Sequence, residues 1–247
     1  MKIPSKRLYL HHKTLTKEQL KMANIFTSSI GKKLIMSISG LFLIVFLLLH
    51  ATINGLSLIS PEAFKAGCDF MALPIITVMV PVLALGILIH IIYGFYLSAT
   101  NLKARGSERY AVAHKGAADN WASKNMLVLG IIVLCGIAFH LTHFWADMQL
   151  EMFKGVPHDQ LADPYVLLLE TFKPWWVVVI YIVWFVAIWY HLTHGFWSAF
   201  HTVGLNNDIW MKRLKVASYI FATLIAGAFI VIAVVAWLKA NGIIACC

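Results

Sequence analysis

Residues 34–56 read LIMSISGLFLIVFLLLHATINGL, and this stretch contains no Lys, Arg, Asp or Glu. A helix needs roughly 20 apolar residues to cross the hydrocarbon core of a bilayer, so this run is long enough to span one. Comparable runs lie near 74–99, 126–146, 175–200 and 214–238. The sequence therefore predicts an all-α membrane protein with five transmembrane helices.

The composition supports a membrane location. Hydrophobic residues make up 60% of the 247 positions and charged residues only 13%, which is too little polar sequence to cover a soluble globule of this size. The formal net charge is +9, but the basic residues lie between the apolar runs rather than in a stripe with aromatic residues. We therefore expect a lipid bilayer, and no nucleic acid, as the surroundings of this chain.

Two parts are expected, an N-terminal segment at residues 1–33 and a five-helix transmembrane domain at residues 34–247. No cleavable signal pattern precedes the first run, so we expect it to stay in the mature protein as a span. Translation could begin at Met1 or at Met22. The cysteines, Cys68, Cys135, Cys246 and Cys247, have no metal-ligand spacing and are assigned no chemistry.

The basic residues predict the orientation in the membrane. Sixteen of the 20 Lys and Arg residues lie in segments 1–33, 101–124 and 205–215, which alternate with segments that hold the remainder. By the positive-inside rule, the N-terminus is cytoplasmic and the C-terminus external, in an inner (cytoplasmic) membrane. Pro74 and Pro174 open two of the runs, whereas Pro81 lies inside the second run and should bend it.

Histidines are concentrated in or at the ends of the spans. Ionisable groups are costly inside a bilayer and by default indicate function. Any single one could instead be a neutral histidine that bonds to a neighbouring helix, but the pattern across helices favours function. The set comprises His50, His90, His140, His143, His191 and His194, with His201 just beyond the fourth span.

Two of these histidines match each other in the first and third spans. His50 follows Gly40 by ten residues, and His140 follows Gly130 by ten residues. Each lies about six residues from the outer end of its helix, which corresponds to a depth of about 9 Å at a rise of 1.5 Å per residue.

A second matching pair lies in the second and fourth spans. His90 begins the sequence HIIYGFY and His191 begins HLTHGFW, and each lies near the inner end of its helix, about 15 Å deeper than the first pair. Each of the two layers thus contains two imidazoles from different helices. This arrangement is what axial ligation of two haems b requires, so we expect the first four helices to form a haem-binding bundle.

Further residues of the motifs bear on this prediction. Gly94 and Gly195 lie one turn from their histidines and would leave room for a flat macrocycle, although they could instead serve close helix packing. Two protein ligands on each iron leave no site for oxygen, which favours electron transfer. Zinc is a weaker alternative because zinc ligands cluster at one point.

His143 and His194 compete as ligands, since each lies one helical turn from a preferred histidine. We prefer His140 because of its spacing from Gly130. We prefer His191 because the matching element around His90 contains no second histidine.

These motifs resemble the cytochrome b subunit of succinate:quinone oxidoreductases, specifically the single-subunit, five-helix, di-haem type that includes menaquinone-linked fumarate reductases. The resemblance covers about residues 30–240. It is carried by SISGLFLIVFLLLH (37–50), PEAFKAGCDFMALP (61–74), HIIYGFYLSAT (90–100), LGIIVLCGIAFHLTHFW (129–145) and HLTHGFWSAF (191–200).

The resemblance implies cofactors and partners. In that family the residues matching His90 and His191 ligate the inner haem, and those matching His50 and His140 ligate the outer haem. A flavoprotein with covalent FAD and an iron–sulfur subunit would complete the complex, which could dimerise. This chain has neither the glycine fingerprint nor the cysteine runs of such subunits, so the dicarboxylate active site is expected on another chain.

The resemblance also implies a quinone site, with menaquinone expected from the two-haem type. An acidic residue at the start of the second span carries protons in relatives, and Asp69 is the nearest match, with Glu62 second and Asp147 more distant; each could instead be a solvated loop acid. Some fumarate reductases have a glutamate where this chain has Trp189, which weakly favours a dehydrogenase or a differently coupled enzyme.

Haem propionates need cationic or hydroxyl partners near the cytoplasmic surface. Ser37, His201, Lys103 and Arg105 are candidates, although the two cations are more simply explained as topology signals.

Two rival functions stay open. A di-haem cytochrome b that anchors a hydrogenase or a formate dehydrogenase would have the same ligands. A non-redox membrane protein, such as a transporter or an assembly factor, could line a path with polar histidines.

Overall fold

The structure is a computed structural model that describes residues 28–105, 121–157 and 160–245. Five of its helices are long and apolar enough to cross a membrane, which confirms the predicted all-α membrane fold. The spans are Ser29–Leu58, Pro74–Ala104, Met126–Phe153, Trp175–Thr202 and Asp208–Ala240. Most of segment 1–33, including Met22, and also Cys246 and Cys247 lie outside the described residues.

Several spans are built from more than one helical element. The first comprises α2 (Ser29–Gly55) and the 3-10 helix η1 (Leu56–Leu58), and the second comprises α4 (Pro74–Thr77) and α5 (Met79–Arg105). The third comprises α7 (Met126–His140), the π-helix η2 (Leu141–Leu150) and α8 (Glu151–Phe153). Single helices form the fourth, α10 (Trp175–Thr202), and the fifth, α11 (Asp208–Ala240). Short helices complete the described chain: α3 (Pro61–Met71), α6 (Trp121–Lys124) and α9 (Pro164–Phe172).

Prolines and polar caps define where these helices begin. Pro74 occupies the first turn of α4, and Pro174 is the N-cap of α10, as the sequence predicts. The second span is interrupted at Val78, between α4 and α5. Pro81 explains the interruption, because it has no N–H for the carbonyl of Thr77 and its ring crowds that carbonyl.

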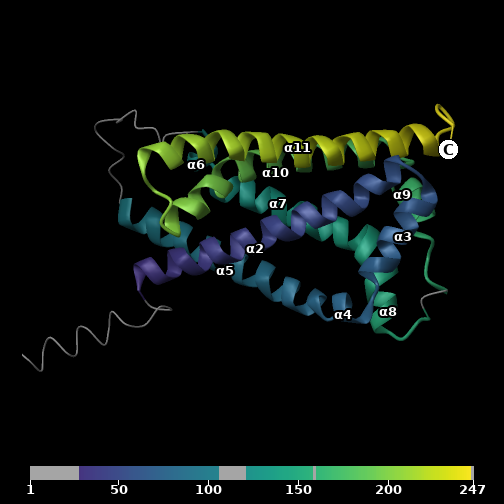
Figure 1. Cartoon of the computed structure of the whole chain (residues 1–247), viewed down its shortest axis with the longest axis horizontal. Coiled ribbons are helices and arrows are strands. Elements are labelled where there is room, and N and C mark those ends of the chain that lie inside the picture. The colour runs from purple at the N-terminus through teal and green to yellow at the C-terminus, as the bar shows by residue number, and fades with distance from the viewer. Residues whose placement is uncertain (1–27, 106–120, 158–159, 246–247) are drawn as a thin grey trace, which may run out of the picture.

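The helix that organises the bundle is α10. Its most extensive contacts are with α11, and it also packs against α2 and α7, while α5 is held mainly by α2. Figure 1 shows α11 along one side of the molecule and α5 diverging from the other helices towards the end that carries α3, α4 and α8. The four helices with the paired histidines therefore form one bundle, and α11 packs against its outside.

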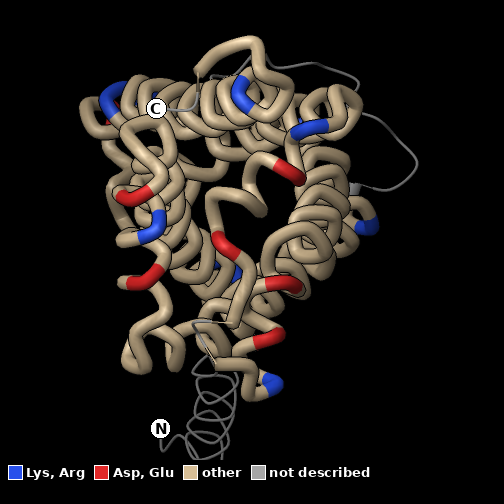
Figure 2. The backbone as a smooth tube through the Cα atoms, turned by 90° about the vertical axis from the view of Figure 1, so that its right-hand side faces the viewer, with Lys and Arg blue, Asp and Glu red and all other residues tan. Residues whose placement is uncertain are grey.

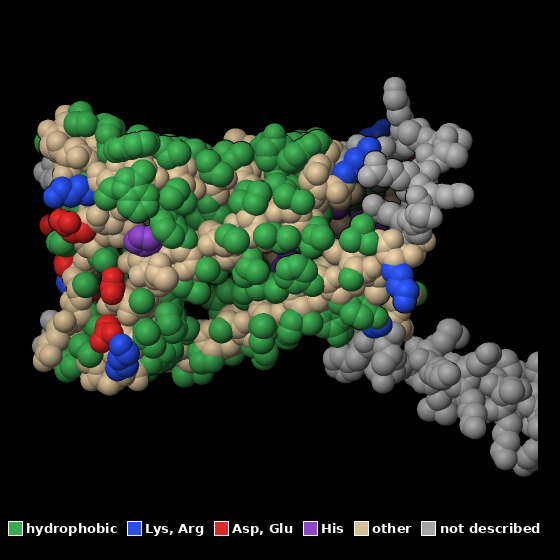
Figure 3. Space-filling model, turned by 180° about the vertical axis from the view of Figure 1, so that it is seen from behind, with side chains coloured by type: hydrophobic (Ala, Val, Ile, Leu, Met, Phe, Trp, Pro, Cys, Tyr) green, Lys and Arg blue, Asp and Glu red, His purple; other side chains and the backbone are tan. Residues whose placement is uncertain are grey.

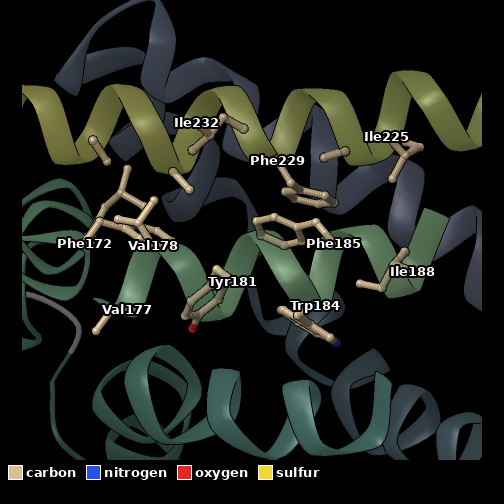
Figure 4. Packing of buried hydrophobic residues seen from close by; sticks show 14 of the residues in the cluster. Phe172, Val177, Val178, Tyr181, Trp184, Phe185, Ile188, Ile225, Phe229 and Ile232 are labelled. Carbon is tan, nitrogen blue, oxygen red and sulfur yellow. The ribbon is translucent and has the colours of Figure 1, made fainter. Parts of the chain in front are cut away.

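A hydrophobic core joins α10 to α11 and α9. Phe185 of α10 stacks on Phe229 of α11, with ring centroids 5.3 Å apart, and Tyr181 packs against Phe172 of α9. Figure 4 shows Phe185 and Phe229 between the two long helices, and Tyr181 on the side of α10 that points away from α11. Half of the most apolar 18-residue stretch of α10 is buried, compared with none of the corresponding stretch of α5.

The surface agrees with a membrane environment. Figure 3 shows a broad hydrophobic belt without Lys, Arg, Asp or Glu on the visible face, between two ends that carry charges. Figure 2 looks onto the end that carries α3, α8 and α9, where both acidic and basic positions lie around the rim. Charge is thus confined to the regions that would meet water and lipid headgroups.

Candidate cofactor site between four helices

The first histidine pair joins α2 to α7. The rings of His50 and His140 lie next to each other in an edge-on arrangement, with centroids 5.8 Å apart and planes at 89°. Aromatic rings surround the pair on several helices: Phe46, Phe144, Tyr181, Trp184 and Phe229 all have centroids within about 6.5 Å of one of the two imidazoles. The pair therefore sits in an almost wholly apolar environment.

The second pair joins α5 to α10. The ring centroids of His90 and His191 are 6.2 Å apart, with planes at 63°. Unlike the first pair, this one has a polar neighbour, since Nδ1 of His90 lies 3.3 Å from Oγ of Ser39. Nδ1 of His191 is buried and has no hydrogen-bond partner among the described residues.

The spacing within each pair fits two imidazoles on opposite sides of one metal ion. A bond from a metal ion to a histidine nitrogen is about 2 Å long, which places the centroids of two opposed rings roughly 6 Å apart. Both observed separations agree with this value. The angle between the ring planes does not affect the test, because each ring can rotate about its own metal–nitrogen bond.

The competing histidines occupy different surroundings. The ring of His143 packs edge-on against Phe139, and its Nδ1 lies 2.8 Å from the carbonyl oxygen of Phe139, which makes Nδ1 the donor. His194 packs against Trp197, and its buried Nδ1 has no partner within the described chain. The structure thus brings together the four preferred histidines and leaves these two outside the pairs.

No three His, Cys, Asp or Glu side chains converge as metal ligands in the described parts of the chain. Within those parts, each pair therefore offers only two such side chains to a metal ion. Two ligands from the protein suit a metal ion whose other coordination positions are filled by a bound macrocycle, as in a haem b.

The predicted glycines differ in their packing. A Cβ atom on Gly130 would meet nothing within 4 Å, and those on Gly94 and Gly195 would meet only methionine methyl groups, at 3.6 and 3.8 Å. These three positions therefore have no need of glycine for close contact between the described helices, and they leave room that a flat ligand could use. Gly40 is tighter, because its Cβ would lie 3.3 Å from Cε1 of His90.

The methionines beside these glycines reveal an internal repeat that sequence inspection missed. Met36 of α2 reaches Gly94 of α5, and Met126 of α7 reaches Gly195 of α10. Both α2 and α7 contain Met-x3-Gly-x9-His, in which the histidine belongs to the first pair. The two halves of the bundle are thus built alike, and the recurring methionine is the signal that could have identified the repeat.

Other residues around the outer pair also escaped the sequence prediction. The indole N–H of Trp184 donates to the carbonyl oxygen of Val133, at 3.1 Å, and a Cβ on Gly136 would collide with this indole. The hydroxyl of Tyr181 is buried and lacks a hydrogen-bond partner in the described residues. The π-helix η2 begins directly after His140, and such wide turns occur frequently at functional sites.

The predicted quinone-site carboxylates lie on the exposed side of α3. Asp69 is 46% exposed and lies 4.0 Å from Nζ of Lys65. Glu62 is fully exposed, and hydrogen bonds to its backbone N–H and to Ser60 hold the pKa of Glu62 below its ordinary value, which favours the charged form. Asp147 is exposed on η2.

The remaining predicted residues lie nearer the other end of the bundle. Ser37 is buried on α2, whereas His201 and Lys103 are exposed at the ends of α10 and α5. Arg105 is the last residue of α5. Trp189 donates from its indole N–H to Oγ1 of Thr223 on α11, at 2.9 Å.

Comparisons of the chain with protein-family models, curated proteins and solved structures find no match. The function of this chain is therefore inferred from the geometry of its histidines and from its sequence motifs.

Proposed function

We propose that this chain is the di-haem cytochrome b anchor of a succinate dehydrogenase or fumarate reductase complex. It would pass electrons between an iron–sulfur subunit and a quinone in the membrane. The observation that carries the proposal is the presence of two histidine pairs, with centroids 5.8 and 6.2 Å apart, on four separate apolar helices.

The histidines would hold one haem b in each layer. A haem b supplies a reversible one-electron couple, and its potential depends on its ligands and surroundings. His50 and His140 would ligate the outer iron, and His90 and His191 the inner iron. With two imidazoles on each iron, the protein would leave no site there for another ligand.

The separation of the layers supports electron transfer across the membrane. Gly40 lies against the inner ring of His90, and His50 of the outer pair lies ten residues further along the same helix. Ten helical residues correspond to about 15 Å. With one haem in each layer, an electron would cross the bilayer in short steps, from the inner side towards the outer side.

The aromatic rings around His50 and His140 have a definite role in this proposal. Trp184 and Phe229 approach the outer imidazoles from two helices and exclude water from that layer. A dry, apolar environment penalises a change of charge on a cofactor and so helps to set its potential. The anchored indole of Trp184 also restricts how far the ring of His140 can turn.

The identity of the partners rests on the sequence resemblance. A flavoprotein with FAD and an iron–sulfur subunit would dock at the cytoplasmic end, which carries most of the Lys and Arg residues. The quinone, expected to be menaquinone, would react near the outer layer, with Asp69 and Glu62 as proton carriers from α3. The complex would reside in the inner membrane, with the N-terminus cytoplasmic.

The test is to purify the full complex in detergent and to measure its haem content and spectrum. We expect two haems b per chain, both reduced by succinate through the partner subunits and reoxidised by a menaquinone analogue. A protein that lacks haem after expression with ample haem supply would contradict the proposal. Co-purification of a nickel or molybdenum subunit instead would replace it with the hydrogenase or formate dehydrogenase alternative.

A further inference from the structure

Ser39 is a buried serine of α2, with 8% of its surface exposed, and it bonds in two directions. Its hydroxyl donates to the carbonyl oxygen of Met36 at 3.0 Å and lies 3.3 Å from Nδ1 of His90. A serine hydroxyl has one proton, and a carbonyl can only accept. With that proton directed to Met36, the hydroxyl presents a lone pair to His90, and Nδ1 of His90 is assigned as the donor; the carbonyl of Met36 is a second acceptor beside the same ring.

This bond determines which nitrogen of His90 is available to a metal. A neutral imidazole carries its proton on one nitrogen only, so donation from Nδ1 leaves the lone pair on Nε2. The nitrogen that lacks the proton is the one that can ligate, and a hydrogen-bond acceptor behind the ring makes that ligand more basic.

We infer that Ser39 is a positioning residue, which fixes the tautomer and orientation of His90 and makes the inner histidine pair electronically different from the outer pair. The inference rests on the proposed function, because the difference is expressed in the inner haem.

The neighbouring glycine brings the hydroxyl within reach. A Cβ on Gly40 would lie 3.3 Å from Cε1 of His90 and 3.7 Å from its Nδ1. The backbone of α2 therefore passes close to the edge of the imidazole, and two consecutive residues, Ser39 and Gly40, contact the same ring. A ring held on one side by a hydrogen bond and by close backbone contact has little freedom to turn.

The other three imidazoles lack such a contact. Nδ1 of His191 is buried without a partner, and no hydrogen bond to a ring nitrogen of His50 or His140 is found among the described residues. Ser39 thus provides the one side-chain hydrogen bond to a ring nitrogen of the two pairs among the described residues, and the carbonyl of Met36 lies beside the same imidazole.

The experiment compares Ser39→Ala with the unaltered complex, purified with its haems. Without the serine acceptor, the imidazole of His90 becomes a weaker donor of electron density to iron, which favours the reduced state. We expect the midpoint potential of the inner haem to rise while that of the outer haem stays unchanged. We also expect a changed electron paramagnetic resonance signal of the oxidised inner haem, because this signal depends on the angle between the two imidazole planes.

A His90→Ala complex, which should retain only the outer haem, identifies which signal belongs to which layer. Ser57→Ala is the matched control, since Ser57 is also buried and also donates to a carbonyl three residues earlier, that of Asn54, at 2.6 Å. It contacts neither pair and should leave both potentials unchanged. Ser39→Thr keeps the hydroxyl and should restore the native inner potential.

The outcomes separate this inference from the proposed function. A shift confined to the inner haem, or loss of that haem alone with recovery in Ser39→Thr, supports the role of Ser39. An unchanged inner potential and signal in a two-haem Ser39→Ala complex overturns it, as does an equal shift of both haems. An unaltered complex without haem would instead overturn the proposed function on which the inference rests.

Discussion

The outer and inner histidine pairs are similar in spacing but differ in surroundings. His50 and His140 lie next to each other among aromatic rings from several helices, with Trp184 fixed to the backbone of α7. His90 and His191 meet where α5 has little buried surface and where Ser39 supplies a hydrogen bond. Packing against aromatic side chains thus orients the rings of His50 and His140. The ring of His90 is instead oriented by the hydrogen bond to Ser39 and by the backbone of α2 beside it. The same ligand pair can therefore give two haems with different properties.

The largest effects should come from removing a ligand. We expect His140→Ala to abolish the outer haem and to leave the inner haem partly assembled, because the two layers use different helices. We expect His191→Ala to abolish the inner haem. Haem content per chain and low-temperature absorption spectra measure both effects. Normal haem content in either variant would show that the pair is not a ligand pair.

Asp69→Asn tests whether the quinone reaction near the outer histidine pair depends on a carboxylate. General acid or base groups contribute about 100-fold or more to rates, so we expect quinone turnover to fall by at least tenfold. Haem content should stay normal, because Asp69 lies on the exposed side of α3. Lys65→Ala, which removes the nearby cation from the same helix face, is the control for a purely electrostatic effect. Unchanged turnover in Asp69→Asn removes this residue from the quinone site.

Two glycines of α7 provide a matched pair for comparing the layers. Gly136→Val should displace Trp184 and cost about 1–3 kcal/mol of stability through overpacking, with partial loss of the outer haem. A Cβ on Gly130 would meet nothing within 4 Å, so we expect Gly130→Val not to lower the thermal stability of the haem-free protein. The Gly130→Val variant should still contain less inner haem if the macrocycle lies beside residue 130. Equal stability losses in both variants would contradict this difference.

The smallest effects are expected at the neighbouring histidines. His143→Ala and His194→Ala should retain both haems, because the structure directs these rings to Phe139 and Trp197 rather than into the pairs. The measurement is again haem content, with His140→Ala and His191→Ala as positive controls. Loss of a haem in His143→Ala, together with normal haem content in His140→Ala, would show that the outer ligand on α7 and η2 is His143 rather than His140.

Much of the fold could be predicted from sequence because hydropathy and helical rise depend only on consecutive residues of the chain. Runs such as 34–56 contain no charge and match the thickness of a bilayer, so the five spans follow from their length. The grouping of His50 with His140, and of His90 with His191, follows from counting residues from the helix ends at a fixed rise. The effect of Pro81 follows from the hydrogen bond that a proline cannot make.

What the tertiary structure decided is which faces of the helices meet. In lipid, the faces that contact protein and those that contact acyl chains are both apolar, so periodicity along a span does not tell one from the other. The contact of Ser39 with His90, the collision of a Cβ on Gly136 with Trp184, and the wide turn after His140 depend on the rotation and approach of whole helices. Sequence alone therefore predicted which imidazoles share a layer, and only packing in three dimensions determined what each one touches.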